Sequence, residues 1–255
     1  MSLLSMRGVT HHFAGLRAVS EFNLELQPGE LVALIGPNGA GKTTIFNIIS
    51  GVYRPTAGDV WLGDRSVIGR RPHEIVGYGI ARTFQNIRLF RNLTALDNVR
   101  IAREGHAHTA LLATMLHLPA FRREERLVRE RSMELLEIFG LQDVAGALAG
   151  SLPYGQQRRL EMARALATDP RLLLLDEPAA GMNPGEADGL LDRILWLRQE
   201  FDLTILLIEH QMAVVMGVAE RVVVLDFGET IAEGTPAEIR SNRRVIEAYL
   251  GEEAV

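Results

Sequence analysis

The sequence predicts an α/β fold with a mostly parallel sheet, an antiparallel β edge and an inserted α-helical subdomain. Short apolar segments recur as expected strands, at 31–35, 172–175, 204–208 and 222–225. Helical segments alternate with the later strands, which is typical of a parallel sheet covered by helices. Between these parts, a helical pattern alone covers a long middle segment. We therefore expect a core made of residues 1–86 and 161–255, and a helical subdomain at 87–160.

The first third of the chain is rich in expected strands, which supply the antiparallel edge. A strand over 24–26 leads into a Pro28-Gly29 turn and then into the apolar strand at 31–35. Another strand, over 59–62, follows a second turn. These strands are short and close together in sequence. They precede the βα alternation that builds the rest of the core.

Composition limits the class of protein. The chain has 255 residues, 47% of them apolar, which is enough for one large domain or two interlocked domains with an apolar core. The net charge of −5 disfavours nucleic acid as a partner, since domains that bind it usually carry a basic face. There are no cysteines, which excludes disulfides and thiolate chemistry. We expect a protein that is soluble by itself, because no signal peptide is visible and the apolar stretch at 110–119 is about half of the ~20 residues of a membrane helix.

A glycine-rich segment follows the apolar strand at 31–35 and precedes an expected helix. We assign it to phosphate binding; its residues are Gly36, Pro37, Asn38, Gly39, Ala40, Gly41, Lys42, Thr43 and Thr44. Glycines let the backbone wrap around an anion, and N–H groups at the helix start point toward it. The lysine ammonium then reaches the β- and γ-phosphates, and the Thr43 hydroxyl binds Mg²⁺. A plain glycine turn is the alternative, but strand, loop and helix together favour a nucleoside triphosphate site.

Two carboxylates end the apolar strand at 172–175. A strand buried on both faces delivers its last residues to the carboxyl edge of the sheet, where ligands bind in open α/β folds. Asp176 is placed to hold Mg²⁺, directly or through water. Glu177 points to the other side of the strand, which suits a carboxylate that orients or deprotonates an attacking water. Alone, this segment would be a strand with a polar end, but beside a phosphate loop we favour the catalytic interpretation.

Two further polar residues belong to the same edge. His210 follows the apolar strand at 204–208, where it can sense a γ-phosphate, although a lone histidine there is usually structural. Gln85 lies where the core meets the helical subdomain and can contact Mg²⁺ or the attacking water. Spacing alone leaves the functional and structural interpretations of Gln85 equally weighted.

A third segment, at 152–159, is a turn followed by a helix start. Gly155 leaves room for close backbone approach, and the helix N-terminus can face a γ-phosphate supplied by another subunit. Taken alone, the segment is better explained as an amphipathic helix that follows a Pro-Tyr-Gly turn.

Together and in this order, the motifs resemble those of the ATP-binding cassette (ABC) ATPases over nearly the whole chain. The resemblance implies a P-loop NTPase core of the RecA-like type that hydrolyses ATP with Mg²⁺. It implies that Phe13 stacks on adenine and that Gln85 is the residue of the family's glutamine loop. Asp176 and Glu177 then form the second phosphate motif, and His210 is the switch histidine.

The resemblance also assigns Tyr154, Gly155 and Gln156 to the family's signature. It implies a head-to-tail dimer in which each nucleotide lies between the phosphate loop of one subunit and the signature of the other. Here Pro153 and Tyr154 replace the usual serine and first glycine. This change removes a hydroxyl and one backbone N–H from the expected γ-phosphate cradle.

The segments at 154–161 and 177–184 resemble one branch of the family, the branched-chain amino acid importers of the LivG type. That branch implies a heterodimer with a second ABC ATPase that has a fuller signature. It also implies two membrane permeases and an extracytoplasmic substrate-binding protein. The chain would lie peripherally on the cytoplasmic face of the inner membrane, with no nucleic acid partner.

Other functions remain open at this stage. A lipopolysaccharide-exporting ABC ATPase is similar at its C-terminal end, but it is expected to form a homodimer with a serine-bearing signature, which this chain lacks. A non-transport ABC ATPase acting on DNA or ribosomes usually carries long coiled coils, zinc motifs or two fused cassettes, and none is present. A nucleotide-gated binding module without turnover would have no need of both Glu177 and His210.

Overall fold

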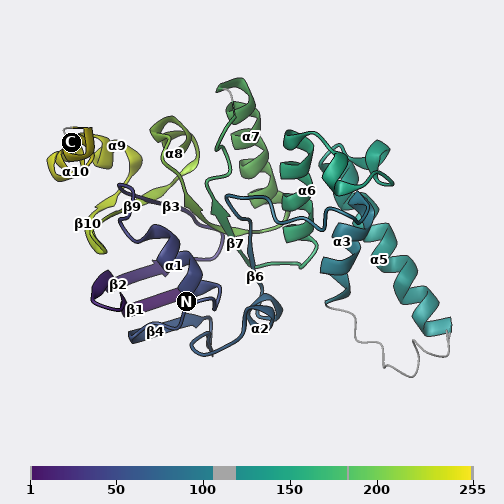
Figure 1. Ribbon diagram of the computed structural model, residues 1–255, viewed down its shortest axis with the longest axis horizontal. Helices are drawn as coiled ribbons and strands as arrows, with labels where there is room; N and C mark the ends of the chain where they lie inside the picture. Colours follow the sequence, from purple (N-terminus) through teal and green to yellow (C-terminus); the bar gives the residue numbers. More distant parts are fainter. Residues whose placement is uncertain (1, 106–118, 183, 254–255) are drawn as a thin grey trace. The chain divides into compact units, whose positions relative to one another are not determined.

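The computed structural model describes residues 2–105, 119–182 and 184–253 (Figure 1). Residue 183 and nearly all of the apolar stretch at 110–119 lie outside the described residues. The chain divides into two compact units. The first combines Met1–Gln85 with Arg171–Val255, and the second is residues 86–170.

A six-stranded sheet forms the centre of the first unit, in the order β10-β9-β3-β8-β7-β6. The strands are β3 (Leu31–Ile35), β6 (Ile80–Arg82), β7 (Leu172–Asp176), β8 (Thr204–Ile208), β9 (Arg221–Asp226) and β10 (Glu229–Gly234). Pairing is parallel from β9 to β6, and only β10 is antiparallel to its neighbour in this sheet. Every residue of β3, β7 and β8 is buried, which explains their unbroken apolar sequences.

An antiparallel sheet in the same unit has the order β2-β1-β4-β5. Its strands are β1 (Leu4–Phe13), β2 (Leu16–Leu26), β4 (Ala57–Leu62) and β5 (Arg65–Ser66). The alternating burial of β2 between Phe22 and Leu26 is that of a sheet with one face on the core. The predicted α/β class, with a mostly parallel sheet and an antiparallel edge, is confirmed.

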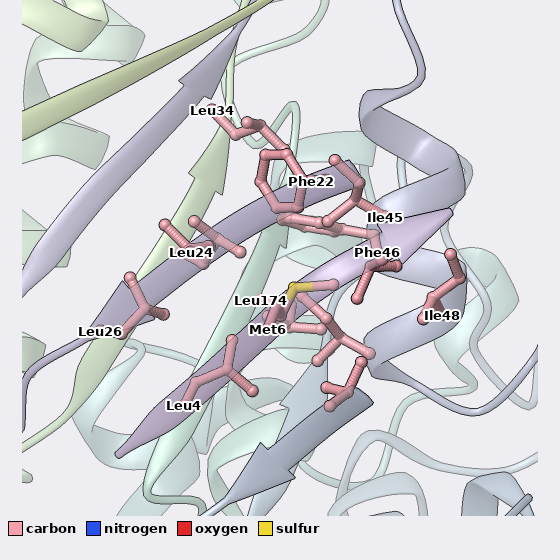
Figure 2. Close-up of a cluster of buried hydrophobic side chains, with 14 of the residues drawn as sticks. Leu4, Met6, Phe22, Leu24, Leu26, Leu34, Ile45, Phe46, Ile48 and Leu174 are labelled. Carbon is pink, nitrogen blue, oxygen red and sulfur yellow. The ribbon is translucent and has the colours of Figure 1, made fainter. Parts of the chain in front are cut away.

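Helices cover both faces of the parallel sheet. They are α1 (Lys42–Ile49), α2 (Pro72–Gly77), α7 (Pro184–Glu200), α8 (Met212–Val218), α9 (Pro236–Ser241) and α10 (Arg243–Glu253). One face packs Leu34 and Leu174 against Phe46 of α1 and against the antiparallel sheet (Figure 2). The opposite face packs Ala33 and Ile35 with residues of α8, α9 and α10. Successive residues of β3 thus serve two different cores, since strand side chains alternate.

The second unit is helical. It contains α3 (Ala95–Glu104), α5 (Pro119–Ile138) and α6 (Tyr154–Leu166), with short 3-10 turns at Gln142–Val144 and Ala149–Ser151. Thr94 caps α3 by accepting a hydrogen bond from the Asp97 amide. This unit runs to residue 170, whereas the sequence placed the boundary at 160, because α6 is one continuous helix that packs on α3 and α5. Among the described residues, no helix combines the length and apolarity that a membrane crossing requires.

Candidate active site

The phosphate loop joins the end of β3 to the start of α1. Gly36 has φ 147° and Gly41 has φ 104°, a region that favours glycine. A Cβ at Gly36 would lie 2.0 Å from the Leu225 carbonyl oxygen, and a Cβ at Gly41 would lie 2.5 Å from that of Ala18. Glycine is therefore required at both positions for two reasons. The backbone angle favours glycine, and the neighbouring carbonyl oxygens of Leu225 and Ala18 leave no room for a side chain.

Lys42 begins α1 and is only 6% exposed. Its Nζ donates to the carbonyl oxygens of Gly36 and Pro37, at 2.6 and 2.7 Å. These contacts hold the ammonium against the loop, beside the amides that begin the helix. A positive charge and a helix N-terminus at one place favour an anionic ligand.

A pocket of about 310 Å³ opens on this loop. Residues 38–44 line it together with Ala18, Gln85, Glu177 and His210. The pocket therefore brings the phosphate loop together with the three residues that the sequence selected as candidate catalytic groups. Its composition of backbone amides, hydroxyls and a lysine fits a polyphosphate and its counter-ion.

Glu177 lies at the centre of the candidate catalytic group. Its Oε2 accepts a hydrogen bond from Gln85 Nε2, and its Oε1 lies 2.6 Å from His210 Nε2; the Gln85 contact is also 2.6 Å. Gln85, Glu177 and His210 follow β6, β7 and β8, whose carboxyl ends are adjacent because the strands are parallel. Glu177 also has φ 48°, a conformation that is uncommon for a non-glycine residue and is over-represented at functional sites.

Asp176 is the last residue of β7 and is buried. Its Oδ2 accepts a hydrogen bond from Arg82 Nη2 at 2.8 Å, and Arg82 is the last residue of β6. The sequence did not single out Arg82. Its position three residues before Gln85, at the end of a strand, was the available signal.

A second residue that the sequence missed is Glu209, a buried carboxylate beside His210. Its Oε1 accepts from the Ala179 amide at 3.0 Å, and its Oε2 accepts from the His210 amide at 3.1 Å. Glu209 thereby joins the loop after Glu177 to the loop that carries His210. A charged residue at the end of an otherwise apolar strand was the only hint of this role.

Phe13 ends β1 and is 40% exposed. It meets His11 edge-on at 4.6 Å and Tyr53 edge-on at 5.2 Å, measured between ring centroids. His11 and Tyr53 stack in parallel at 5.4 Å. This aromatic cluster fixes the Phe13 ring and leaves part of it open, which suits stacking with a planar ligand.

The candidate signature residues lie in the helical unit, at the start of α6. Pro153 is the N-cap of α6, and its carbonyl accepts from the Gln156 amide at 2.9 Å. Gly155 is exposed, and the half-exposed Tyr154 accepts from Arg158 Nε at 3.1 Å through its hydroxyl. The helix therefore presents its N-terminus at the surface, with the Tyr154 ring held beside it.

A phosphate loop, a buried aspartate and a carboxylate held at the ends of parallel strands define a P-loop nucleoside triphosphatase. The sequence profile "ABC transporter" matches residues 19–180, and "Branched-chain amino acid ATP-binding cassette transporter" matches residues 229–255. The chain is 48% identical to "High-affinity branched-chain amino acid transport ATP-binding protein BraF" of Pseudomonas aeruginosa, over 98% of both chains. It is also 48% identical to the corresponding protein LivG of Escherichia coli K12, over 98% of both chains.

A solved structure agrees with these sequence comparisons. The ADP conformation of MJ1267, an ATP-binding cassette of an ABC transporter, has a TM-score of 0.84 and 30% identity, and the match covers 98% of this chain and 99% of that one. The chain belongs to the ABC transporter family, as an ATP-binding subunit that hydrolyses ATP with Mg²⁺. The resemblance inferred from the motifs is confirmed.

Proposed function

We propose that this protein is the ATP-hydrolysing subunit of an importer for branched-chain amino acids. The observation that carries the ATPase part is Glu177, held between Gln85 and His210 in the pocket of the phosphate loop. The choice of substrate is supported by the names of the relatives, which are 48% identical over nearly the whole chain. Substrate choice would belong to other subunits, since a fold alone does not specify it.

The geometry of the phosphate loop supports the phosphate-binding roles in this proposal. In this proposal residues Gly36 to Thr44 hold the triphosphate, and Lys42 neutralises charge at its outer phosphates. Thr43, Gln85 and Asp176 would hold Mg²⁺, which would supply further charge neutralisation. Phe13 stacks on the adenine.

The hydrolytic roles belong to the three strand-end residues. Glu177 accepts a proton from the attacking water, because it is the carboxylate in the pocket whose orientation is fixed by two hydrogen bonds. His210 and Gln85 hold that carboxylate and respond to the γ-phosphate. Each of the three contributes from a different strand end, so a shift of any loop changes the geometry of the group.

The assembly we propose is a heterodimer. Pro153 has no backbone N–H and Tyr154 adds bulk where the family has a small residue, so this signature would form a weak γ-phosphate cradle for a partner. A second ATPase with a fuller signature would complete the site on this chain. Two membrane permeases and an extracytoplasmic substrate-binding protein complete the proposed transporter, with this chain on the cytoplasmic face of the inner membrane.

Two measurements test the proposal. The purified chain alone should be a weak ATPase, and addition of the second cassette and the permeases should raise its turnover. Deletion of the gene for this chain should abolish high-affinity uptake of labelled leucine, isoleucine and valine by its host. Return of the intact gene should restore that uptake. Unchanged uptake in the deletion strain would reject the substrate, while rapid cooperative turnover by the isolated chain would reject the heterodimer.

A further inference from the structure

Arg82 joins two parts of the candidate site through one buried guanidinium. Its side chain is 6% exposed, and its Nη2 lies 2.8 Å from Asp176 Oδ2. Its Nη1 donates to Asn47 Oδ1 at 2.7 Å and to Ser50 Oγ at 3.2 Å. Asn47 lies on α1 and Ser50 is the C-cap of that helix. The end of the phosphate-loop helix and the tip of β7 are therefore held by the same side chain.

Two aromatic rings fix the guanidinium in place. Its central carbon lies 5.4 Å from the ring centroid of Phe46 and 5.0 Å from that of Phe84. Stacking on rings while forming several directed hydrogen bonds is a property of arginine that lysine does not share. Burial of this charge costs desolvation, which an apolar residue at the same place would avoid. The arrangement therefore indicates a role for the charge beyond stability.

A carboxylate that already has a cation partner attracts a second cation less strongly. The charge of Arg82 opposes binding of a free divalent ion at Asp176, while its hydrogen bond keeps the carboxylate in one orientation. Mg²⁺ usually binds through one or two carboxylates together with substrate phosphates. The missing negative charge at this site would then come from the nucleotide.

We infer that Arg82 is a positioning residue for the metal-binding carboxylate. It fixes the orientation of Asp176 and offsets its charge, so that the divalent ion binds with the nucleotide and not before it. The inference rests on the proposed role of Asp176 as a metal ligand. Arg82 does not itself contact the reacting atoms in this scheme.

Mn²⁺ binding to the full chain, followed by electron paramagnetic resonance of the free ion, tests the inference without measuring turnover. Arg82→Met removes the charge and keeps an apolar stem beside Phe46 and Phe84. We expect the nucleotide-free affinity for Mn²⁺ to rise about tenfold or more, because a unit charge next to the carboxylate is removed. An affinity within about twofold of the parent, in a variant with a cooperative thermal transition, overturns the inference.

Arg82→Lys separates charge from geometry. It keeps the positive charge but cannot bridge Asp176 and α1 with a planar fork. We expect a nucleotide-free Mn²⁺ affinity within about threefold of the parent, and binding of Mn²⁺ with ADP that is weaker by about threefold or more. If Arg82→Met does not fold, Arg82→Lys alone tests the inference. An unchanged affinity of Arg82→Lys for Mn²⁺·ADP would reject the positioning role.

Arg221→Met is the matched control. Arg221 also forms an ion pair, with Glu30 at 2.7 Å, but it lies at the first position of β9, at the opposite end of the strands from the site. Its loss should leave both Mn²⁺ affinities within about twofold. A rise equal to that of Arg82→Met would show an effect of overall charge and overturn the inference.

Asp176→Asn distinguishes this inference from the proposed function. If this variant binds Mn²⁺·ADP as the parent does, the metal role of Asp176 is wrong and the proposed site must be revised. If Asp176→Asn loses the metal while neither Arg82 variant changes any affinity, only the inference about Arg82 is overturned.

Discussion

Glu177→Gln is expected to stop hydrolysis and leave ATP binding intact. The Glu177 carboxylate lies between Gln85 Nε2 and His210 Nε2, each at 2.6 Å. Glutamine has the same shape, and its amide oxygen still accepts from Gln85. Its NH₂ group can donate to His210 once the imidazole carries its proton on Nδ1. The variant thus keeps the pocket and loses only the ability to accept a proton.

The size of the effect follows from this separation of shape and basicity. A positioned general base contributes about 10²–10⁴ to a rate, which is about 3–5 kcal/mol of barrier. Nucleotide affinity should change by less than about twofold, since Lys42 and the loop amides hold the phosphates without Glu177. The two quantities should therefore diverge by at least about two orders of magnitude.

Single-turnover hydrolysis of γ-labelled ATP by the assembled complex measures the hydrolysis rate, and calorimetric titration with ATP measures the nucleotide affinity. Glu238→Gln serves as a control, because Glu238 caps α9 by accepting from the Thr235 amide at 2.7 Å. That variant should hydrolyse ATP at the parent rate. Hydrolysis by Glu177→Gln within about tenfold of the parent would show that the general base lies elsewhere.

Three other variants address separate parts of the structure. Lys42→Ala should weaken ATP binding by about 1.5–3 kcal/mol in a calorimetric titration, the worth of a charged hydrogen bond, and unchanged affinity would reject the phosphate-loop assignment. Phe13→Ala should cost about 1–3 kcal/mol for ATP and nothing for inorganic triphosphate; equal affinity of the parent for both ligands would contradict base stacking. Burial raises the pKa of Glu30, but hydrogen bonds from Arg221 and the Gln27 amide outweigh it and leave that pKa below its ordinary value of 4.5. The Glu30 carboxylate therefore stabilises the fold above its unfolded pKa, and this contribution is lost as pH falls through its folded pKa. Removal of its partner in Arg221→Met should lower the melting temperature at pH 7. It should also make stability depend less on pH on the acid side.

The central strands were predictable because their burial is complete. A strand with both faces covered needs an unbroken apolar sequence, and 172–175 and 204–208 are such sequences. The strand predicted at 24–26 is the end of a longer one, Leu16–Leu26, whose first half is largely exposed and has no regular apolar alternation. β1 pairs with both β2 and β4 through irregular registers. Its extent depends on partners that are distant in sequence, which local patterns do not reveal.

The candidate site likewise contains some residues that the sequence predicts and others that only the structure reveals. Gly36 to Thr44 and Glu177 belong to motifs with fixed spacing, so the sequence selects them without knowledge of the fold. Arg82 and Glu209 belong to no motif, because each acts by joining segments that only the tertiary structure brings together. Arg82 contacts a helix 32 and 35 residues earlier and a strand 94 residues later. A single sequence can show that such a residue ends a strand, but not which distant segments it contacts.

The position of Glu177 depends on the neighbouring strand ends as well as on its own strand. Its backbone N–H donates to the Ile208 carbonyl at 2.9 Å and its side chain contacts His210, so two attachments are to the end of β8, and a third comes from Gln85 after β6. Glu209 ties the same loop to the Ala179 amide. The left-handed backbone at Glu177 is maintained by these contacts, since an isolated residue of its size would avoid it. A movement of the His210 loop would therefore disturb the carboxylate, and in the proposed mechanism a shift of residues 208–210 would change the rate of hydrolysis.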